Sequence, residues 1–182
     1  MFFPDKTFTL KDGRTALLRA PRREDAAAVL DCFITTAGET EFLLNYPEEI
    51  AFTVEGEEAF LMSARESADE LMIICEVEGQ VAGSCNLMFK RRIKNRHIAT
   101  LGISLKKAYW SLGIGGALMA EVIRAARQRE GVRFIDLEVV QDNARAIALY
   151  EKMGFELVCV KPDAFRFRDG TFHGECLMRL KL

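Results

Sequence analysis

The sequence predicts an α+β fold in which a mixed, mainly antiparallel sheet of about seven strands is flanked by about four helices. Apolar runs at 8–10 and 15–19 are joined by a turn containing Gly13, which is typical of a β-hairpin. Strand-like runs at 71–77 and 81–90 are separated by a tight connection and should pair antiparallel. Farther along the chain strands and helices alternate, so the sheet is expected to be mixed.

Four segments carry apolar residues at helical spacing, namely 23–36, 53–67, 114–130 and 143–153. The third is the most regular, because Ile114, Leu118 and Val122 fall on one stripe. The remaining strand candidates are 97–105, 134–140, 156–160 and 172–181. A chain of 182 residues is close to the size of one domain, and it shows no linker or internal repeat. We therefore expect a single domain over 1–182.

The composition argues against several classes of function. The 25 basic and 27 acidic residues give a net charge of -2, which is unlike a general nucleic-acid binder. The one basic cluster, Lys90–His97, is expected to be a solvated hairpin tip. No apolar run reaches the roughly 18 residues of a membrane span, so we expect a cytoplasmic protein with no membrane partner. Five scattered cysteines and two histidines suggest no metal site.

A glycine-rich segment, Trp110-Ser111-Leu112-Gly113-Ile114-Gly115-Gly116, joins a predicted strand to the most regular helix. Glycines here would leave backbone N–H groups open to a ligand, and the positive end of the helix dipole would favour an anion such as a pyrophosphate. The same glycines would also allow close packing of the helix on the sheet, and this segment alone does not decide between the two. Its spacing matches neither the dinucleotide-binding nor the P-loop pattern.

The helix at 143–153 carries a second pattern. Asn143, Ala146 and Tyr150 are three and four positions apart, so they lie along one helical face that could hold an extended ligand. Each also has an ordinary structural explanation. Asn143 is a good helix N-cap, and Tyr150 is surrounded by apolar neighbours like a core tyrosine.

Together these two segments resemble the GNAT superfamily of N-acetyltransferases. Residues 110–116 resemble its [Q/R]-x-x-G-x-[G/A] motif, with Trp110 in place of Gln or Arg, and residues 143–155 resemble its N-x-x-A-x-x-[L/F]-Y-x-x-x-G-F pattern. The resemblance implies binding of acetyl-CoA (coenzyme A), with the pantetheine arm along the preceding strand. The cofactor-binding residues that it implies are Ile103, Ser104, Leu105, Trp110, Ser111, Leu112, Gly113, Ile114, Gly115, Gly116, Asn143 and Tyr150.

The resemblance also implies an activity, which is transfer of the acetyl group to a primary amine of a small molecule or a peptide. The departing thiolate needs a proton, and a phenol with an ordinary pKa of about 10 still holds one at neutral pH. Tyr150 is therefore the candidate general acid. The alternative is a catalytically weak acyl-CoA-binding module that acts as a sensor or interaction domain. Homodimers are common in this superfamily.

The general base is the least determined role. The family usually places a Glu on the strand before the glycine turn, but residues 98–103 contain no acid. Glu138 on the next strand is the candidate, because a carboxylate on an apolar sheet needs a partner or a polar cleft. A structural ion pair is the more common explanation for such a carboxylate. Other candidates are Glu76, His97 and an ordered water relay.

The resemblance places the acceptor pocket at about 37–58 and 161–172. The first segment is acidic, which favours a cationic amine, although carboxylates on a helix surface are usually solvated. Phe42, Leu43, Leu44 and Tyr46 could form an apolar wall of that pocket or belong to the core.

Overall fold

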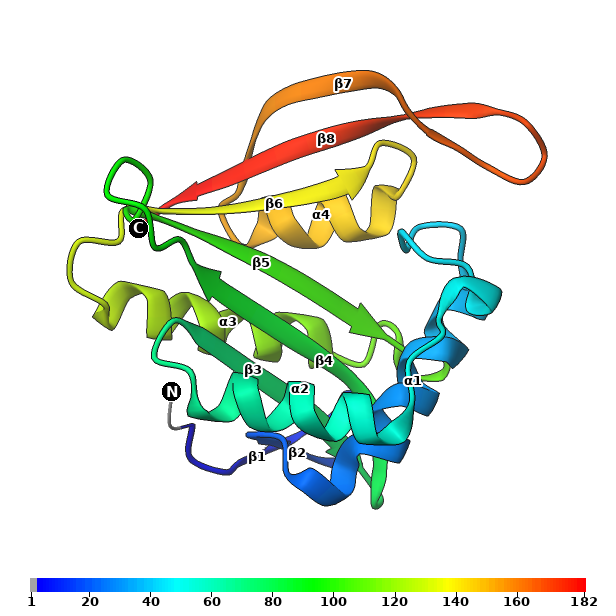
Figure 1. The fold of residues 1–182 in the computed structure, drawn as a ribbon, viewed down its shortest axis with the longest axis vertical. Coiled ribbons are helices and arrows are strands. Elements are labelled where there is room, and N and C mark those ends of the chain that lie inside the picture. Colours follow the sequence, from blue (N-terminus) through cyan, green and yellow to red (C-terminus); the bar gives the residue numbers. More distant parts are fainter. Residues whose placement is uncertain (1–2) are drawn as a thin grey trace.

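Eight strands form one sheet in the computed structural model, which describes residues 3–182 (Figure 1). The strands are β1 (Lys6–Thr9), β2 (Thr15–Arg19), β3 (Glu70–Val77), β4 (Gln80–Phe89), β5 (Ile98–Leu105), β6 (Phe134–Val140), β7 (Glu156–Arg166) and β8 (Phe172–Lys181). Their order in the sheet is β1-β2-β3-β4-β5-β6-β8-β7, and every pair is antiparallel except β5 with β6. The predicted mixed, mainly antiparallel sheet is confirmed, with eight strands instead of about seven.

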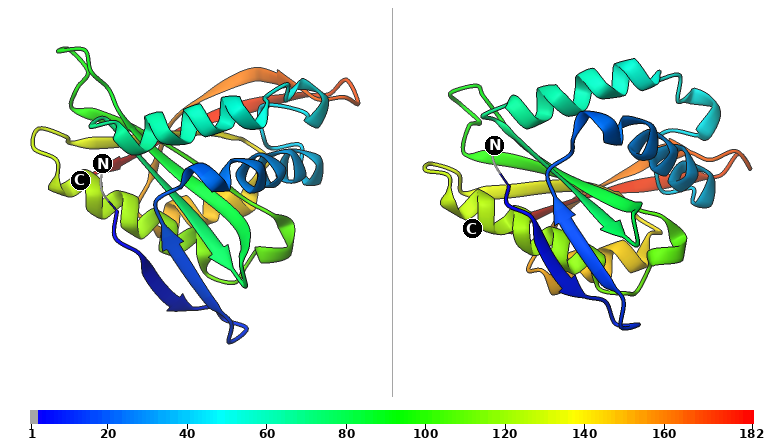
Figure 2. Two further views of the ribbon diagram at one scale, coloured as in Figure 1. Left: turned by 60° about the horizontal axis from the view of Figure 1, so that its bottom comes forward. Right: turned by 90° about the horizontal axis from the view of Figure 1, so that it is seen from below.

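In the described part of the chain, four helices cover the two faces of this sheet (Figure 2). They are α1 (Ala26–Glu39), α2 (Val54–Glu66), α3 (Ile114–Gln128) and α4 (Ala144–Lys152). Helices α1 and α2 pack with β3 and β4 on one face, whereas α3 and α4 pack on the other. The first helix starts three residues later than predicted, because Arg23–Asp25 form a 3-10 turn. There the Asp25 carboxylate binds the buried Arg19 guanidinium at 2.6 and 2.8 Å.

The alternating pattern of β6 shows how the larger core is built. Ile135, Leu137 and Val139 are buried toward α3 and α4, which supply Leu118 and Tyr150 to the same cluster. A smaller cluster lies under α1 and α2. Four of the five cysteines are buried in these regions, and Cys159 is exposed. Within residues 3–182, no helix is both long enough and apolar enough to cross a membrane.

The sheet opens between β5 and β6. These strands pair only from Ile98↔Phe134 to Thr100↔Asp136 and then diverge (Figure 1). Beyond Thr100, β5 still pairs with β4 on its other side, out to Leu105 opposite Gly83. One edge of residues 101–105 therefore has no partner strand, and its backbone N–H and C=O groups are available to a ligand.

Candidate functional site

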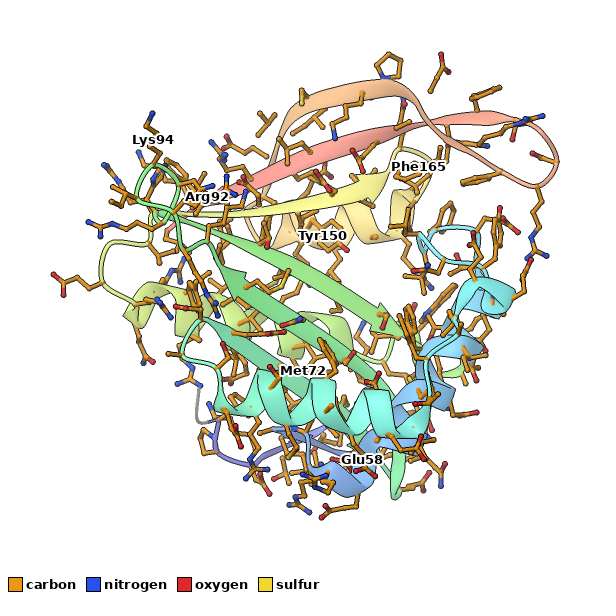
Figure 3. All side chains as sticks on the ribbon, viewed as in Figure 1. Glu58, Met72, Arg92, Lys94, Tyr150 and Phe165 are labelled. Carbon is orange, nitrogen blue, oxygen red and sulfur yellow. The ribbon has the colours of Figure 1, made fainter. Side chains whose placement is uncertain are left out.

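A cleft of about 1510 Å³ lies where the sheet opens. One part, here called the glycine-turn half, is lined by the end of β5, residues 110–116 and α4. The other part, here called the aromatic half, is lined by α1, α2, the segment between them and the end of β7. In the view of Figure 3, Tyr150 lies beside α4, Phe165 lies toward the β7–β8 loop, and Met72 lies across the opening from both.

The glycine turn has the geometry of an anion site. Gly113 is the N-cap of α3 and adopts a φ of 101°, a left-handed conformation that favours glycine. The hydrogen bonds of α3 begin with the Ala117 N–H, which donates to the Gly113 carbonyl at 3.1 Å. The preceding N–H groups of the first turn therefore have no acceptor within the helix. A Cβ on Gly113 or Gly116 would meet nothing within 4 Å, so both glycines border open space.

Gly115 has a different role in the same turn. A Cβ at this position would lie 2.9 Å from Leu149 Cδ2, so the absence of a side chain allows α3 to pack closely on α4. Close packing thus explains Gly115, whereas Gly113 and Gly116 border open space. Leu112 and Ile114 do not line the cleft, since Leu112 packs against the core and Ile114 is buried in it. Their side chains therefore face the core, and only their backbone groups belong to the glycine turn.

Trp110 lies at the edge of the cleft and is held there by a hydrogen bond to the backbone of β5. Its Nε1–H donates to the Leu105 carbonyl at 2.8 Å, which ties the indole to the end of β5. The Arg145 guanidinium, from the first turn of α4, lies over the indole face. Within residues 3–182, Arg145 has no carboxylate partner, and it lines the cleft together with Trp110. Sequence reasoning passed over Arg145, because an exposed helical arginine carries no signal by itself.

The face of α4 turns Asn143, Ala146 and Tyr150 toward the cleft. Asn143 is the N-cap, and its Oδ1 accepts from the Ala146 N–H at 3.2 Å. Its side-chain NH₂ group makes no hydrogen bond within the described chain. The structural explanation of Asn143 therefore holds, and it leaves two donors for a ligand.

Tyr150 is both a core residue and a cleft residue, with 7% of its surface exposed. Its ring lies 6.1 Å from that of Phe155. Burial, with a smaller contribution from Cys85, raises the pKa of Tyr150 above its ordinary value. Among residues 3–182 the Tyr150 hydroxyl has no hydrogen-bond partner. The phenol is therefore protonated at neutral pH and available to donate.

Of the side chains considered as a base, only Glu138 lines the cleft. It follows the last β5–β6 pair, and its side chain is 59% exposed. Lys161 Nζ lies 3.8 Å from Glu138 but binds Glu175 more closely, at 2.5 Å, so Glu138 is loosely paired. Glu76 is bound to Arg19 at 2.8 Å, and His97 packs edge-on against Phe134 outside the cleft.

The aromatic half brings together side chains from several elements. Phe33 of α1 stacks on Phe52, with ring centroids 6.4 Å apart. The predicted wall residues Phe42, Leu43, Leu44 and Tyr46 all line the cleft. Phe165 also lines it, within the predicted segment 161–172, and so do Phe33 and Phe60, which lie outside both predicted segments. Their separation along the chain leaves no local signal that they share a surface.

A loop contact closes the outer end of the aromatic half. The backbone N–H of Arg168, in the β7–β8 loop, donates to the Tyr46 hydroxyl at 3.2 Å. The Arg168 guanidinium forms an ion pair with Glu48 and lies 4.0 Å from the centre of the Tyr46 ring. The β7–β8 hairpin is thereby joined to the segment between α1 and α2. The basic cluster that contains Arg92 and Lys94 lies in a different loop, away from Tyr150 and Phe165 (Figure 3).

Residues 38–155, well over half of the chain, match the family model described as the Acetyltransferase (GNAT) family. The L-amino acid N-acetyltransferase AaaT of Escherichia coli (strain K12) is 34% identical over 86 residues, which cover 47% of this chain and 52% of that protein. An uncharacterized N-acetyltransferase of Methanocaldococcus jannaschii is also 34% identical over 86 residues, covering 46% of this chain and 38% of that protein. The chain thus spans about half the length of these relatives or less.

Solved structures resemble the chain over most of its length. A GNAT-family acetyltransferase from Streptococcus pneumoniae is 29% identical with a TM-score of 0.85, covering 92% of this chain and 99% of that one. A ribosomal-protein-alanine N-acetyltransferase from Brucella melitensis is 25% identical with a TM-score of 0.79, covering 91% and 99%. The structure of yncA from Salmonella typhimurium, solved with its cofactor acetyl-CoA, is 20% identical with a TM-score of 0.78, covering 91% and 92%, and shows a shared fold.

Proposed function

Because the chain belongs to the GNAT acetyltransferase family, we propose that it transfers the acetyl group of acetyl-CoA to a primary amine of a small molecule or peptide. One observation carries the proposal. The glycine turn and the Tyr150 hydroxyl border the same cleft, at the point where β5 and β6 separate. A turn suited to an anion and a side chain suited to donate a proton thus lie in one cleft.

The residues present fit coenzyme A. The first-turn N–H groups of α3 and the open space beside Gly113 and Gly116 suit a pyrophosphate. The unpaired edge of residues 101–105 offers backbone partners to the amides of a pantetheine arm, and Ile103, Ser104 and Leu105 line the cleft there. The free NH₂ group of Asn143 offers a further donor to the same arm.

Two side chains take the proton-transfer roles in this proposal. Acetyl-CoA supplies an acyl group activated as a thioester, so the C–N bond to the amine forms as the C–S bond breaks. Tyr150 donates its proton to the departing sulfur and regains one from water. Glu138 accepts a proton from the amine nitrogen, directly or through water. Its loose pairing with Lys161 leaves a carboxylate oxygen available for that purpose.

Calorimetry with coenzyme A, followed by thiol-release assays on a panel of amines, tests the proposal. We expect submillimolar binding and turnover with at least one amine. Failure of both coenzyme A and acetyl-CoA to bind would end the proposal. Binding without thiol release on any amine or peptide would instead favour the alternative, an acyl-CoA-binding module. The sequence feature behind this alternative is that residues 98–103 lack the family's usual strand carboxylate.

The role of Glu138 has its own test. We expect Glu138→Gln to lower kcat about 100-fold, within the range for loss of a general base, and its rate to rise with pH as more amine becomes deprotonated in solution. Glu151→Gln, an exposed carboxylate of α4 that does not line the cleft, is the matched control and should leave kcat unchanged. An unchanged kcat in Glu138→Gln would remove the residue from the mechanism.

A further inference from the structure

The aromatic half exposes an unusual amount of apolar surface on the inside of a cleft. Phe52 and Phe60 are 58% and 45% exposed, and Leu44 is 80% exposed, although all three line the cleft. Phe165, from β7, adds a further ring. A concave surface of this kind gains most from an occupant that is itself apolar, because such an occupant removes the surface from water.

One carboxylate stands free among these rings. Glu57 lines the cleft from α2, one helical turn from Phe60 on the same face, and has no ion pair or hydrogen bond within residues 3–182. Burial raises the pKa of Glu57, which means that the carboxylate lacks the counter-charge that would offset its loss of water. The neighbouring acids differ, since Glu41 accepts from the Tyr46 hydroxyl and Glu49 from the Tyr46 N–H.

We infer that the acceptor is a primary amine that carries an aromatic or bulky apolar group, with the group seated among the phenylalanines and the ammonium attracted into the cleft by Glu57 before Glu138 takes its proton. This inference rests on the proposed acetyl transfer. A single free carboxylate provides for one positive charge, so a polyamine with several charges fits this half poorly. An ammonium near Glu57 would supply the missing counter-charge.

Matched acceptors test the inference, each pair differing only in a ring. We expect kcat/KM to be at least tenfold higher for 2-phenylethylamine than for ethylamine, or for L-phenylalanine than for L-alanine. Phe52→Ser should raise the KM of the ring-bearing acceptor, and Glu57→Gln should do the same. Neither should change the KM of acetyl-CoA. Glu55→Gln, an exposed acid of α2 that does not line the cleft, is the control for Glu57.

Two failures are distinguishable. If acetyl transfer occurs but the ring raises kcat/KM in neither pair, or spermidine is the best acceptor, the inference is overturned and the proposed function stands. If coenzyme A does not bind at all, the proposed function itself fails.

A separate observation carries a second inference, at the other end of the cleft. Trp110 stands where the family motif has Gln or Arg, so a polar contact near the pyrophosphate is missing from that position. The indole N–H cannot replace it, because it is bound to the Leu105 carbonyl. Arg145 lies over this indole, lacks a carboxylate partner in the described chain, and lines the cleft beside the glycine turn.

The geometry points to Arg145 as a binding residue for a phosphate of coenzyme A, with Trp110 as the platform that orients the guanidinium. A planar guanidinium presents several N–H donors in a fixed plane and can bind two phosphate oxygens at once. Stacking on an anchored indole restricts the side chain before the ligand arrives, which lowers the entropy cost of binding. This inference also rests on the proposed use of coenzyme A.

Calorimetry with three probes tests it: coenzyme A, 3′-dephospho-coenzyme A and pantetheine, which has no phosphate. We expect Arg145→Gln to raise the Kd of both phosphate-bearing probes about tenfold, as for loss of a charge-assisted hydrogen bond, and to leave pantetheine unchanged. A loss confined to coenzyme A would assign the contact to the 3′-phosphate, and a loss with both would assign it to the diphosphate. Arg127→Gln, an exposed arginine of α3, is the control.

A double-mutant cycle tests the platform. Trp110→Leu should weaken coenzyme A binding, and adding Arg145→Gln to it should cost less than Arg145→Gln costs alone, because the two side chains act as a unit. An unchanged Kd for coenzyme A in Arg145→Gln would overturn the inference about Arg145. The proposed function would still stand in that case, provided that the wild-type protein binds coenzyme A.

Discussion

The two halves of the cleft are built in different ways. The glycine-turn half is formed by short continuous segments, the strand end and turn at 103–116 and the helix that follows Asn143. The aromatic half collects single side chains from α1, from the segment before α2, from α2 itself and from the end of β7. Contacts between neighbours in sequence can be predicted from local patterns, whereas a surface assembled from distant elements depends on how the whole chain packs.

The largest expected effect concerns Tyr150, which belongs both to the hydrophobic core and to the lining of the cleft. Tyr150→Phe should lower kcat about 100- to 1000-fold, as for loss of a general acid, with little change in the KM of acetyl-CoA. Because burial raises the pKa of Tyr150, the wild-type kcat should not fall on the alkaline side up to about pH 9.5. Tyr109→Phe, which does not line the cleft, is the control. A Tyr150→Phe enzyme with full kcat would refute the assignment.

A smaller effect is expected from the backbone of the glycine-turn half. Gly113→Ala forces an alanine into a left-handed conformation, at a cost of about 1 to 2 kcal/mol. Displacement of the first-turn N–H groups should raise the Kd of coenzyme A about tenfold. Gly131→Ala is a close control, since its φ is 82°, its Cβ would also meet nothing within 4 Å, and it lies outside the cleft.

Both glycine variants should lower Tm by a similar few degrees, about 2–4 °C per kcal/mol for a chain of this size. Only Gly113→Ala should weaken coenzyme A binding. Equal Kd values in the two variants would show that the turn contributes to stability alone, as the packing of Gly115 already does.

The smallest effect is expected at the outer end of the aromatic half. Arg168→Ala removes the contacts with Glu48 and the Tyr46 ring that join the β7–β8 loop to the segment before α2. These contacts are exposed, so we expect only about a threefold rise in the KM of the amine, with the KM of acetyl-CoA unchanged. Arg23→Ala breaks an exposed ion pair with Glu58 away from the cleft and is the control. A shift in the KM of acetyl-CoA instead would show that the two halves are coupled.

Particular elements show where prediction from sequence succeeds and where it fails. The helix at 114–130 was predicted because its apolar stripe faces the core, and α3 ends within two residues of the predicted boundary. The last part of β7 was missed, since β7 was expected to end at 160 but continues to Arg166. It is an edge strand whose residues are almost all exposed, so hydrophobic alternation, the usual signal of a strand, is absent there.

The sequence by itself determined the order of strands and helices, the glycine turn at the start of α3 and the Asn143 cap with Tyr150 two turns later. These features depend on backbone conformation and on spacing along one helix, which are local properties. Only the tertiary structure decided that Glu138 lies in the cleft while Glu76 is held by Arg19, and that Arg145 covers Trp110. It also decided that Glu57 stands unpaired among rings from distant elements, because burial and pairing depend on side chains that the chain brings together only when it folds.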